Sequence, residues 1–173
     1  MVVTGMFTSE PIRVAPAWTD ANQHLNSVQY LELFRKAAGA FLGELGVSQS
    51  SASTFFQAEA HIRYERELLL DEPLVIHSWL IAVSDKRLHH FHEMRHASAG
   101  FRAATVEYLH LHIDRASRRV ASMPVELLAR LRAALLGSAA QPDARDIGRA
   151  IGLQATSRHA PDVADEPTVR TEA

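Results

Sequence analysis

The chain contains no cysteine, and Lys36 and Lys86 are its only lysines, in a length of 173 residues. Without cysteine there is no disulfide framework, no thiolate nucleophile and no cysteine-ligated metal site. Any chemistry must therefore rest on Asp, Glu, His, Ser, Thr or Tyr. The absence of cysteine is also typical of a reducing compartment.

The sequence also has no large excess of positive or negative charge. It contains 18 Lys and Arg residues and 20 Asp and Glu residues, which gives a net charge of −2. Such a chain has no overall positive field to hold a polyanion, so we expect no nucleic-acid partner. No window reaches the roughly 18 apolar residues of a membrane-spanning helix, and the first residues lack the basic start of a signal peptide. We expect a cytoplasmic protein without a membrane partner.

The length and a hydrophobic fraction of 47% fit one globular domain with a tail. From residue 137 onward the composition shifts to Ala, Asp, Arg and Pro, with few large apolar residues. We therefore divide the chain into a domain of residues 1–136 and a C-terminal extension of residues 137–173. The last part of the extension has the composition of a disordered segment.

The clearest local signal is a helix that begins near Ser27. Apolar residues recur at three- and four-residue spacing from Val28 to Leu45, with Asn26 or Ser27 placed as the N-cap and Gly46 just past the end. Apolar residues cover more than half of its circumference, which is more than a surface helix needs. We predict a helix of about five turns that is wrapped by a sheet.

Strand patterns flank this helix, one before it and four after it at hairpin spacing: 12–17, 58–65, 74–83, 88–96 and 101–113. A second, shorter helix is predicted over 125–136, introduced by Pro124. The order of strand, helix and four strands predicts an α+β fold. In it, a five-stranded antiparallel sheet curls around one long central helix, and a short C-terminal helix follows.

The loop before the long helix gathers a carboxylate, an imidazole and two amides, from Asp20, His24, Asn22 and Asn26. The first backbone N–H groups of a helix lack intrahelical partners and carry the positive end of the dipole, so they can stabilise a developing oxyanion. A nearby carboxylate can then act as nucleophile or general base on the polarised carbonyl. Alternatively, Asp20 and Asn26 only cap the turn and the helix.

A resemblance to a known family bears on this choice. The chain has the pattern Asp20-x-x-x-His24-Leu25-Asn26-x-x-x-Tyr30, then a hydrophobic helix, then the strand Ala60-His61-Ile62-Arg63-Tyr64-Glu65-Arg66-Glu67. Over residues 12–114 this resembles the hotdog-fold acyl-CoA thioesterases of the 4-hydroxybenzoyl-CoA thioesterase type. The resemblance implies hydrolysis of an acyl-CoA thioester to acid and coenzyme A, with no cofactor beyond the coenzyme A of the substrate.

Carried onto this sequence, the resemblance gives roles to the loop residues. Asp20 would attack the thioester or activate the water, and a backbone N–H near Ser27 would polarise the carbonyl. His24 and Asn26 would orient the loop or contact the thioester, and Tyr30 would face the same pocket.

The family pattern has glycine immediately before the histidine, where this chain has Gln23. We expect that residue to alter the loop backbone.

A second carboxylate, Glu67, is the rival general base, because many relatives have an acidic residue at that position. If Asp20 and Glu67 meet at one site across a dimer interface, their repulsion raises one pKa toward neutrality. The alternative for Glu67 is a solvated charge at the end of a strand.

The phosphates of coenzyme A require cations near the site. Lys86 and Arg87 lie in the hairpin where relatives place such cations, and both have the charge and the reach. The alternative is an ordinary solvated turn.

Shorter runs at 59–62, 85–89, 109–114 and 147–151 are similar to thioesterases of carnitine breakdown, whose substrate is betainyl-CoA. A trimethylammonium group needs an aromatic cage, for which the candidates are Trp18, Tyr30, Phe55, Tyr64 and Trp79. The alternative is that these rings belong to the core.

Paired histidines raise the question of a metal. His90 and His92 share one face of a predicted strand, and His110 and His112 share one face of the next. Similar runs are ordinary sheet residues in the resembling family, and the pattern fixes no carboxylate beside them, so we predict no metal site.

Three functions compete for this sequence: thioester hydrolysis, a dehydratase or hydratase reaction on the same fold, and binding of acyl-CoA without turnover. Dehydratases of the fold that this sequence resembles have their histidine and carboxylate on or near the central helix. Asp20 precedes the helix here, which favours hydrolysis. A homodimer, or a dimer of dimers, is expected in each case, because the sheet leaves edge strands and an apolar flank to cover.

Overall fold

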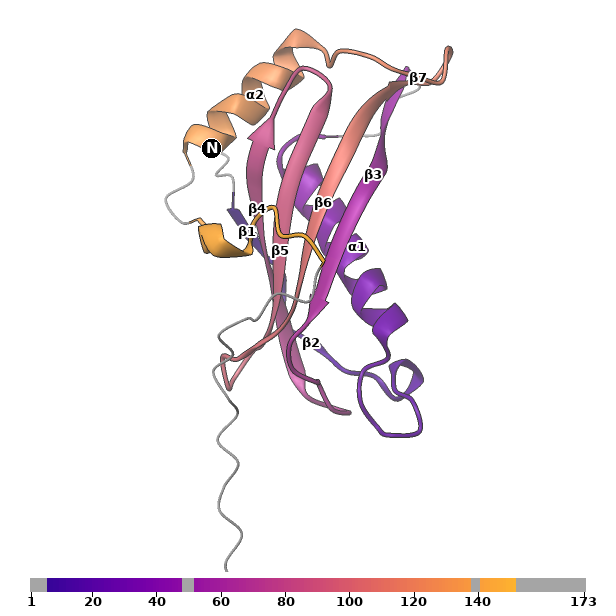
Figure 1. Cartoon of the computed structure of the whole chain (residues 1–173), viewed down its shortest axis with the longest axis vertical. Coiled ribbons are helices and arrows are strands. Elements are labelled where there is room, and N and C mark those ends of the chain that lie inside the picture. The colour runs from indigo at the N-terminus through magenta and orange to yellow at the C-terminus, as the bar shows by residue number, and fades with distance from the viewer. Residues whose placement is uncertain (1–5, 48–51, 138–140, 152–173) are drawn as a thin grey trace, which may run out of the picture.

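One antiparallel sheet packs around a single long helix, α1 (Ser27–Glu44), in the structure, a computed structural model that describes residues 6–47, 52–137 and 141–151. Figure 1 shows α1 lying against one face of the sheet, where it crosses β3 and β6 obliquely. The predicted α+β architecture of a sheet around a central helix is therefore confirmed.

Four long strands form most of the sheet: β3 (Ser53–Tyr64), β4 (Pro73–Val83), β5 (Arg87–His96) and β6 (Arg102–Asp114). Three short strands complete it within the described residues: β1 (Met6–Thr8), β2 (Ile12–Arg13) and β7 (Arg119–Val120). The main path runs β1-β4-β5-β6-β3; β2 also pairs with β4, and β7 pairs with β6.

The predicted first strand over 12–17 is only partly formed. Its place beside β4 is shared by β1 and β2, and β7 is added beside β6, so the sheet has seven strands in the described residues rather than five. Pro16 instead begins a short 3₁₀ helix, η1 (Pro16–Trp18), because proline has no N–H to donate to a sheet.

Helix α1 begins and ends as the sequence predicts. Asn26 is the N-cap, and its side-chain Oδ1 accepts a hydrogen bond from the Val28 amide at 3.0 Å. Gly46 follows the helix with φ of +76°, the left-handed conformation that glycine adopts without strain. Helix α2 (Val125–Leu136) also has its predicted bounds, directly after Pro124.

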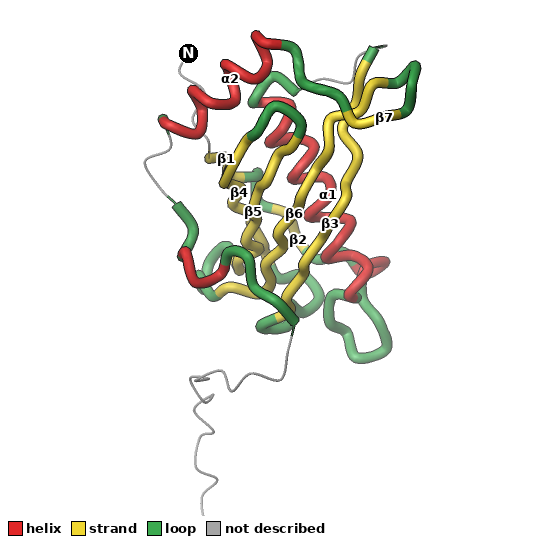
Figure 2. Tube along the Cα trace, turned by 45° about the horizontal axis from the view of Figure 1, so that its top comes forward, coloured by secondary structure: helices red, strands yellow, loops and turns green. Residues whose placement is uncertain are grey.

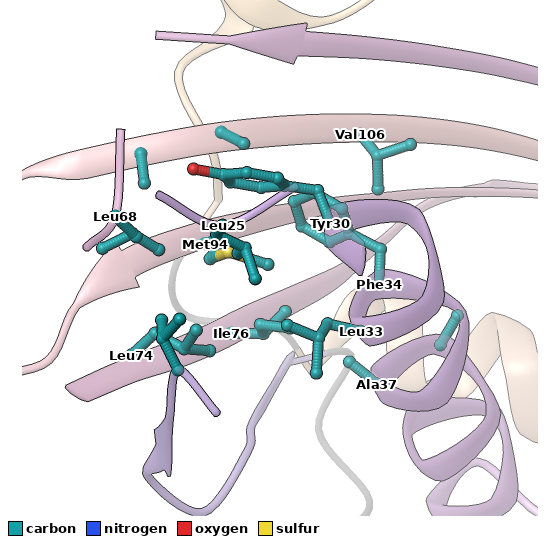
Figure 3. Close-up of a cluster of buried hydrophobic side chains, with 14 of the residues drawn as sticks. Leu25, Tyr30, Leu33, Phe34, Ala37, Leu68, Leu74, Ile76, Met94 and Val106 are labelled. Atoms are coloured by element: carbon teal, nitrogen blue, oxygen red, sulfur yellow. The ribbon is translucent and has the colours of Figure 1, made fainter. Parts of the chain in front are cut away.

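The core lies between α1 and the inner face of the sheet. The buried residues of α1 form its apolar side: Tyr30, Leu33, Phe34, Ala37, Ala38, Phe41 and Leu42. Figure 3 shows part of this packing, with Leu33 and Phe34 of α1 beside Ile76, Met94 and Val106 of the sheet. At the other end of α1, Leu131 of α2 closes the core against Phe41 and Leu80. Figure 2 shows α2 crossing that end of the sheet.

Strand β3 forms one edge of the sheet, since β6 is its only hydrogen-bonded neighbour among the described residues. Residues 56–60 of β3 are exposed, and a bulge interrupts the pairing between Gln57 and Glu59. The sheet therefore presents an open strand edge.

In the described part of the chain, neither helix is long and apolar enough to cross a membrane.

Residues 141–151 lie on the face of the sheet opposite α1 (Figure 1). They include a short 3₁₀ helix, η2 (Ala144–Asp146), and the Gly148 amide, which donates to the Glu107 carboxylate of β6 at 3.0 Å. Part of the predicted C-terminal extension is thus attached to the sheet. The segment predicted to be disordered lies outside the described residues.

Buried histidines form a chain of hydrogen bonds on the inner face of the sheet. Ser78 Oγ lies 2.7 Å from His92 Nδ1, His92 Nε2 lies 2.6 Å from His90 Nδ1, and His90 Nε2 lies 2.8 Å from His110 Nδ1. Both ring nitrogens of His90 and of His92 are used in this chain. In the described residues, no group of three or more His, Asp or Glu side chains is arranged to hold a metal ion.

Burial keeps these imidazoles neutral. Burial, with a smaller contribution from His110, lowers the pKa of His92 to about 3, and burial lowers the pKa of His90 well below its ordinary value. The aromatic rings of Phe34 and Phe41 pack against His92 and exclude water from it. The hydrogen-bonded histidines are therefore an uncharged polar element of the core.

Acid should destabilise the protein through His92. Its pKa of about 3 in the folded state lies below the value of 6.5 for an unperturbed histidine, so its contribution to stability is complete above pH 6.5 and is lost as the pH falls toward 3. Over that range the unfolding free energy should fall by about 1.4 kcal/mol per pH unit for this group. Urea unfolding between pH 7 and pH 4 measures the slope.

The His92→Gln variant should show a shallower slope than the unmodified chain. His61→Gln, a change on the opposite face of the sheet, is the matched control and should leave the slope unchanged. Equal slopes for the unmodified chain and His92→Gln would contradict the assignment.

Candidate functional site

The loop that precedes α1 is joined to the segment that follows β3. The Leu25 amide donates to the Leu68 carbonyl at 2.7 Å, and the Leu70 amide donates to the Gln23 carbonyl at 3.0 Å. These backbone bonds bring Asp20 and its neighbours next to a segment that begins more than 40 residues later in the chain. The predicted Glu67 lies directly before this pairing.

A cleft of about 420 Å³ lies where the two segments meet. Seven of the ten predicted site residues line it: Asp20, His24, Asn26, Ser27, Tyr30, Tyr64 and Glu67. An eighth, Trp18, lies beside it, with its carbonyl oxygen accepting from the Asn26 amide at 2.9 Å. The fold therefore brings together the predicted loop, the start of α1 and the end of β3.

The Asp20 carboxylate is oriented by its own loop. One oxygen, Oδ1, accepts a hydrogen bond from the Asn22 amide at 2.8 Å, and the other, Oδ2, lies 3.5 Å from His24 Nδ1. The side chains of Asp20 and His24 are 31% and 32% exposed. Asp20 does cap a turn, as the alternative interpretation had it, and its carboxylate also lines the cleft.

The first turn of α1 leaves one amide to the cleft. The Val28 amide is bound by the Asn26 side chain, and the Gln29 and Tyr30 amides donate to the Asn26 carbonyl at 2.8 and 3.3 Å. The Ser27 amide has no hydrogen-bond partner among the described residues. It lies at the positive end of the helix dipole, so it is suited to bind an oxygen that gains negative charge.

Gln23 adopts a backbone conformation that is rare for a residue with a side chain. Its φ is +63°, in the left-handed region, where a residue other than glycine pays about 1–2 kcal/mol. The tight turn between Asp20 and His24 forms nonetheless, because the Gln23 amide donates to the Asp20 carbonyl at 3.0 Å. Gln23 therefore occupies a position whose backbone favours glycine.

Two tyrosines form an aromatic corner in the cleft. The rings of Tyr30 and Tyr64 meet edge to face, with centroids 5.4 Å apart and planes at 85°. The Tyr64 hydroxyl donates to the Ser27 carbonyl at 3.3 Å, and burial raises the pKa of Tyr30 above its ordinary value. Figure 3 shows the Tyr30 ring over the core, with its hydroxyl directed toward Leu68.

The other two aromatic candidates lie elsewhere. Phe55 packs against His112 near the start of β3, and Trp79 packs against His77 and Phe91. Trp79 lines a separate cavity beneath residues 141–143. An aromatic site at the cleft is therefore limited to Tyr30 and Tyr64, with Trp18 beside them.

Lys86 and Arg87 lie at the opposite end of the sheet from the cleft. On β6, Arg87 is paired with Leu111, whereas Tyr64 at the cleft is paired with Ala104. Seven residues separate these positions, which corresponds to roughly 23 Å at about 3.3 Å per residue. Both side chains are exposed, and the fold does not bring them to the cleft of the same chain.

Two charged residues of the cleft were not among the predicted site residues, namely Glu65 and Arg66. The Arg66 guanidinium lies over the Phe101 ring, 3.9 Å from its centroid. Arg66 directly precedes Glu67, so the motif that identified Glu67 also contained it. The alternating charges of Glu65, Arg66 and Glu67 in the sequence did not indicate that all three residues line one cleft.

Comparison with known proteins gives a family for the chain. A family model described as the thioesterase-like superfamily matches residues 14–131. That range includes Asp20, all of α1 and all four long strands.

Two curated relatives have similar sequences. A betainyl-CoA thioesterase of Pseudomonas aeruginosa is 29% identical over 152 residues, which is 86% of this chain and 96% of that protein. An L-carnitine dehydrogenase/betainyl-CoA thioesterase of Rhizobium meliloti is 30% identical over 143 residues, or 81% of this chain. The match spans only 29% of the Rhizobium protein.

A solved structure has the same fold. It is a hypothetical protein of Staphylococcus aureus in complex with CoA, with a TM-score of 0.80 at 22% sequence identity, and the match covers 89% of this chain and 99% of that one. The predicted hotdog fold is confirmed.

Proposed function

This chain belongs to the thioesterase-like superfamily, and we propose that it is an acyl-CoA thioesterase, which hydrolyses a thioester to a free acid and coenzyme A. The observation that carries the proposal is that Asp20 and Ser27 line the same cleft, and that the Ser27 amide has no hydrogen-bond partner in the part of the chain that the structure describes. Hydrolysis of a thioester needs these two groups, one to deliver the oxygen and one to stabilise the oxyanion.

In the proposed reaction the thioester carbonyl oxygen accepts a hydrogen bond from the Ser27 amide at the start of α1. The Asp20 carboxylate then takes a proton from a water that attacks the carbonyl carbon, or attacks that carbon itself to form an anhydride that water opens. The carbon–sulfur bond breaks, and the coenzyme A thiolate leaves and is protonated. His24, beside Asp20, orients the carboxylate.

The position of Asp20 favours hydrolysis over the two competing functions. Asp20 lies in the loop before α1 rather than on the helix, unlike the arrangement expected of a dehydratase or hydratase. Binding without turnover would not require a carboxylate beside an unpartnered helix amide. Glu67 lines the same cleft and is the second candidate for general base.

Release of coenzyme A thiol from a panel of acyl-CoA substrates tests the proposal. Asp20→Asn should lower kcat by about 10²- to 10⁴-fold, because the amide can neither accept a proton nor attack. Glu67→Gln should have a smaller effect if Asp20 is the base. Glu126→Gln, on α2 away from the cleft, is the control and should retain full activity.

Two results would contradict this function. One is no thiol release from any substrate of a panel that includes betainyl-, short-chain, long-chain and aryl-CoA. The other is an Asp20→Asn variant that hydrolyses its best substrate at the original rate.

We further propose that betainyl-CoA is the substrate, as the names of the similar Pseudomonas and Rhizobium proteins suggest. The cleft supports a cationic acyl group in two ways. The exposed Tyr64 ring, which packs against Tyr30, offers aromatic surface to a trimethylammonium group, and the carboxylates of Asp20 and Glu67 line the same space.

A neutral isostere separates charge from shape in this proposal. The chain should have a higher kcat/KM for betainyl-CoA than for 3,3-dimethylbutyryl-CoA, which has the same branched shape without the charge. Tyr64→Leu should reduce that preference by about 2- to 30-fold, the range that corresponds to a cation–π interaction of about 0.5–2 kcal/mol. Phe55→Leu, a ring that packs against His112 outside the cleft, is the matched control. Equal kcat/KM for both substrates would overturn the subtype.

We propose a homodimer formed along β3. The exposed stretch 56–60 lies on an open strand edge, and an uncovered edge invites pairing with a second chain. Two copies paired in this way would form one continuous sheet. The exposed Val28 and Leu31 of α1 would supply apolar surface to the same flank.

Sedimentation equilibrium at micromolar concentration should give a particle of two chains or a multiple of two. Ala60→Asp, in the exposed part of β3, should shift the equilibrium toward the single chain, because like charges then meet across the symmetry axis. Val125→Asp on α2 is the control and should leave the assembly unchanged. A stable single chain would refute the dimer.

Two further expectations stay predictions. Lys86 and Arg87 are predicted to bind the phosphates of coenzyme A, while Arg66 is the arginine that lines the cleft itself. A cytoplasmic location is likewise predicted from the sequence.

A further inference from the structure

Residues 141–151, which follow α2 in the sequence, lie across the outer face of the sheet, and we call them the strap. It starts beside Met6 and His77, where residues 141–143 line a cavity, and reaches Glu59 and His61 of β3, where Gly148 and Arg149 line another. Figure 1 shows the strap in front of β5 and β6, with α1 behind the sheet.

Asp146 is the residue that ties the strap to the sheet through charge. Its side chain is only 9% exposed, and it accepts hydrogen bonds from Arg63 Nη1 of β3 at 2.8 Å and from Arg102 Nη1 of β6 at 2.5 Å. Burial acts to raise the pKa of Asp146, but the hydrogen bonds from Arg102 and Arg63 outweigh it and hold the pKa below the ordinary value. Asp146 is therefore a buried, ionised carboxylate between two strands.

The same two arginines bind Glu65, which lines the candidate active-site cleft. Arg102 holds Glu65 with two hydrogen bonds, Nε to Oε2 at 2.8 Å and Nη2 to Oε1 at 2.9 Å. Arg63 adds a contact from Nη2 to Glu65 Oε1 at 2.9 Å. Arg63 thus touches Asp146 of the strap with Nη1 and Glu65 of the cleft with Nη2. Arg102 binds Asp146 through Nη1 and Glu65 through Nε and Nη2, and its Nη2 also lies 3.4 Å from Asp146 Oδ1.

The clamp on Glu65 is also a clamp on the backbone of the cleft wall. The amides of Glu65 and Arg66 both donate to the Ala103 carbonyl, at 2.8 and 3.0 Å, directly beside Arg102. Glu67 follows at once, and all three residues line the cleft. A displacement of Arg102 is therefore transmitted to the segment that carries Arg66 and Glu67.

Arginines outnumber carboxylates in this network. Arg63, Arg95, Arg102 and Arg149 face Glu65, Glu93 and Asp146, with Arg95 bound to Glu93 at 2.8 Å and Arg149 Nη1 4.0 Å from Asp146 Oδ1. Removal of the Asp146 carboxylate increases the excess of positive charge, frees Arg63 Nη1, and leaves Arg102 Nη1 with only its 3.2 Å bond to Glu93 Oε1. A half-satisfied buried network rearranges rather than keeping its geometry.

We propose that Asp146 is a positioning residue for the active site: it holds Arg63 and Arg102 in the orientation that clamps Glu65 and so fixes the wall formed by Arg66 and Glu67. This inference rests on the proposed function, in that the cleft is taken as the site of hydrolysis. The strap, which belongs to the extension outside the predicted catalytic domain, is then part of the catalytic unit.

Steady-state kinetics of full-length variants test the proposal. Asp146→Asn should lower kcat for the best substrate by about 10- to 100-fold, since small misplacement of a site costs that much, and should change KM far less. Asp143→Asn is the matched control, because Asp143 lies on the same strap, its carboxylate hydrogen-bonds only to Arg145 among the described residues, and asparagine can still cap η2. It should retain the original kcat.

Hydrogen exchange gives a readout that does not depend on activity. In Asp146→Asn the amides of Glu65 and Arg66 should exchange at least 10-fold faster, while the amides of α1 keep their protection. If the unmodified chain hydrolyses no acyl-CoA, the proposed function fails but this measurement still decides whether the clamp exists. Unchanged exchange at these two amides overturns the proposal whatever happens to kcat.

A milder variant covers the case in which Asp146→Asn does not fold. Arg63→Lys retains the charge, but a single ammonium group cannot bridge two carboxylates with separate planar donors as a guanidinium does. It should give a smaller drop in kcat together with faster exchange at Glu65. A folded Arg63→Lys variant with the original kcat and the original exchange overturns the proposal.

Discussion

Burial of the apolar side of α1 against the sheet determines where the helix begins, and the candidate site is built at that beginning. Leu33, Phe34 and Phe41 are almost completely buried. The helix cannot slide or rotate without exposing side chains that each contribute about 1.5–3 kcal/mol to stability by their burial. The Ser27 amide is therefore held in place relative to the end of β3, although Ser27 itself is exposed. The packing of the core therefore fixes the position of the site.

The sequence predicted those parts of the fold and site that depend on local pattern. The bounds of α1 follow from apolar spacing, an N-cap and a terminal glycine, and the cleft residues from Asp20 to Tyr30 lie within eleven consecutive positions. The distance from Lys86 and Arg87 to the cleft depends instead on strand register, which the local pattern does not contain. The network of Asp146, Arg102 and Glu65 joins residues 37 and 44 positions apart, and only the folded sheet shows it.

The boundary at residue 136 shows a limit of reading hydrophobicity alone. Beyond that position the chain has few large apolar residues, so the pattern predicted no further helix or strand. Residues 141–151 are attached to the sheet all the same, by the ion pairs of Asp146 and by the Gly148 amide on Glu107.

For the histidines, the local pattern predicted the face of the sheet but not the hydrogen-bond partners. Their alternation along β5 and β6 correctly put His90 and His92 on one face, but only the fold shows that they bond to each other.

The charge balance of the cleft follows from which carboxylates are already paired. Glu65 is neutralised by Arg63 and Arg102, so the acidic charge that remains at the cleft is that of Asp20 and Glu67, beside the Arg66 cation. Two unneutralised carboxylates repel the phosphates of an acyl-CoA but attract a cationic acyl group, whereas Arg66 and the start of α1 attract negative charge. This distribution supports the proposed betainyl-CoA substrate, whose coenzyme A phosphates are negative and whose acyl group is positive. The arginine clamp limits the repulsion of the phosphates, because without it Glu65 would be a third unneutralised carboxylate at the cleft.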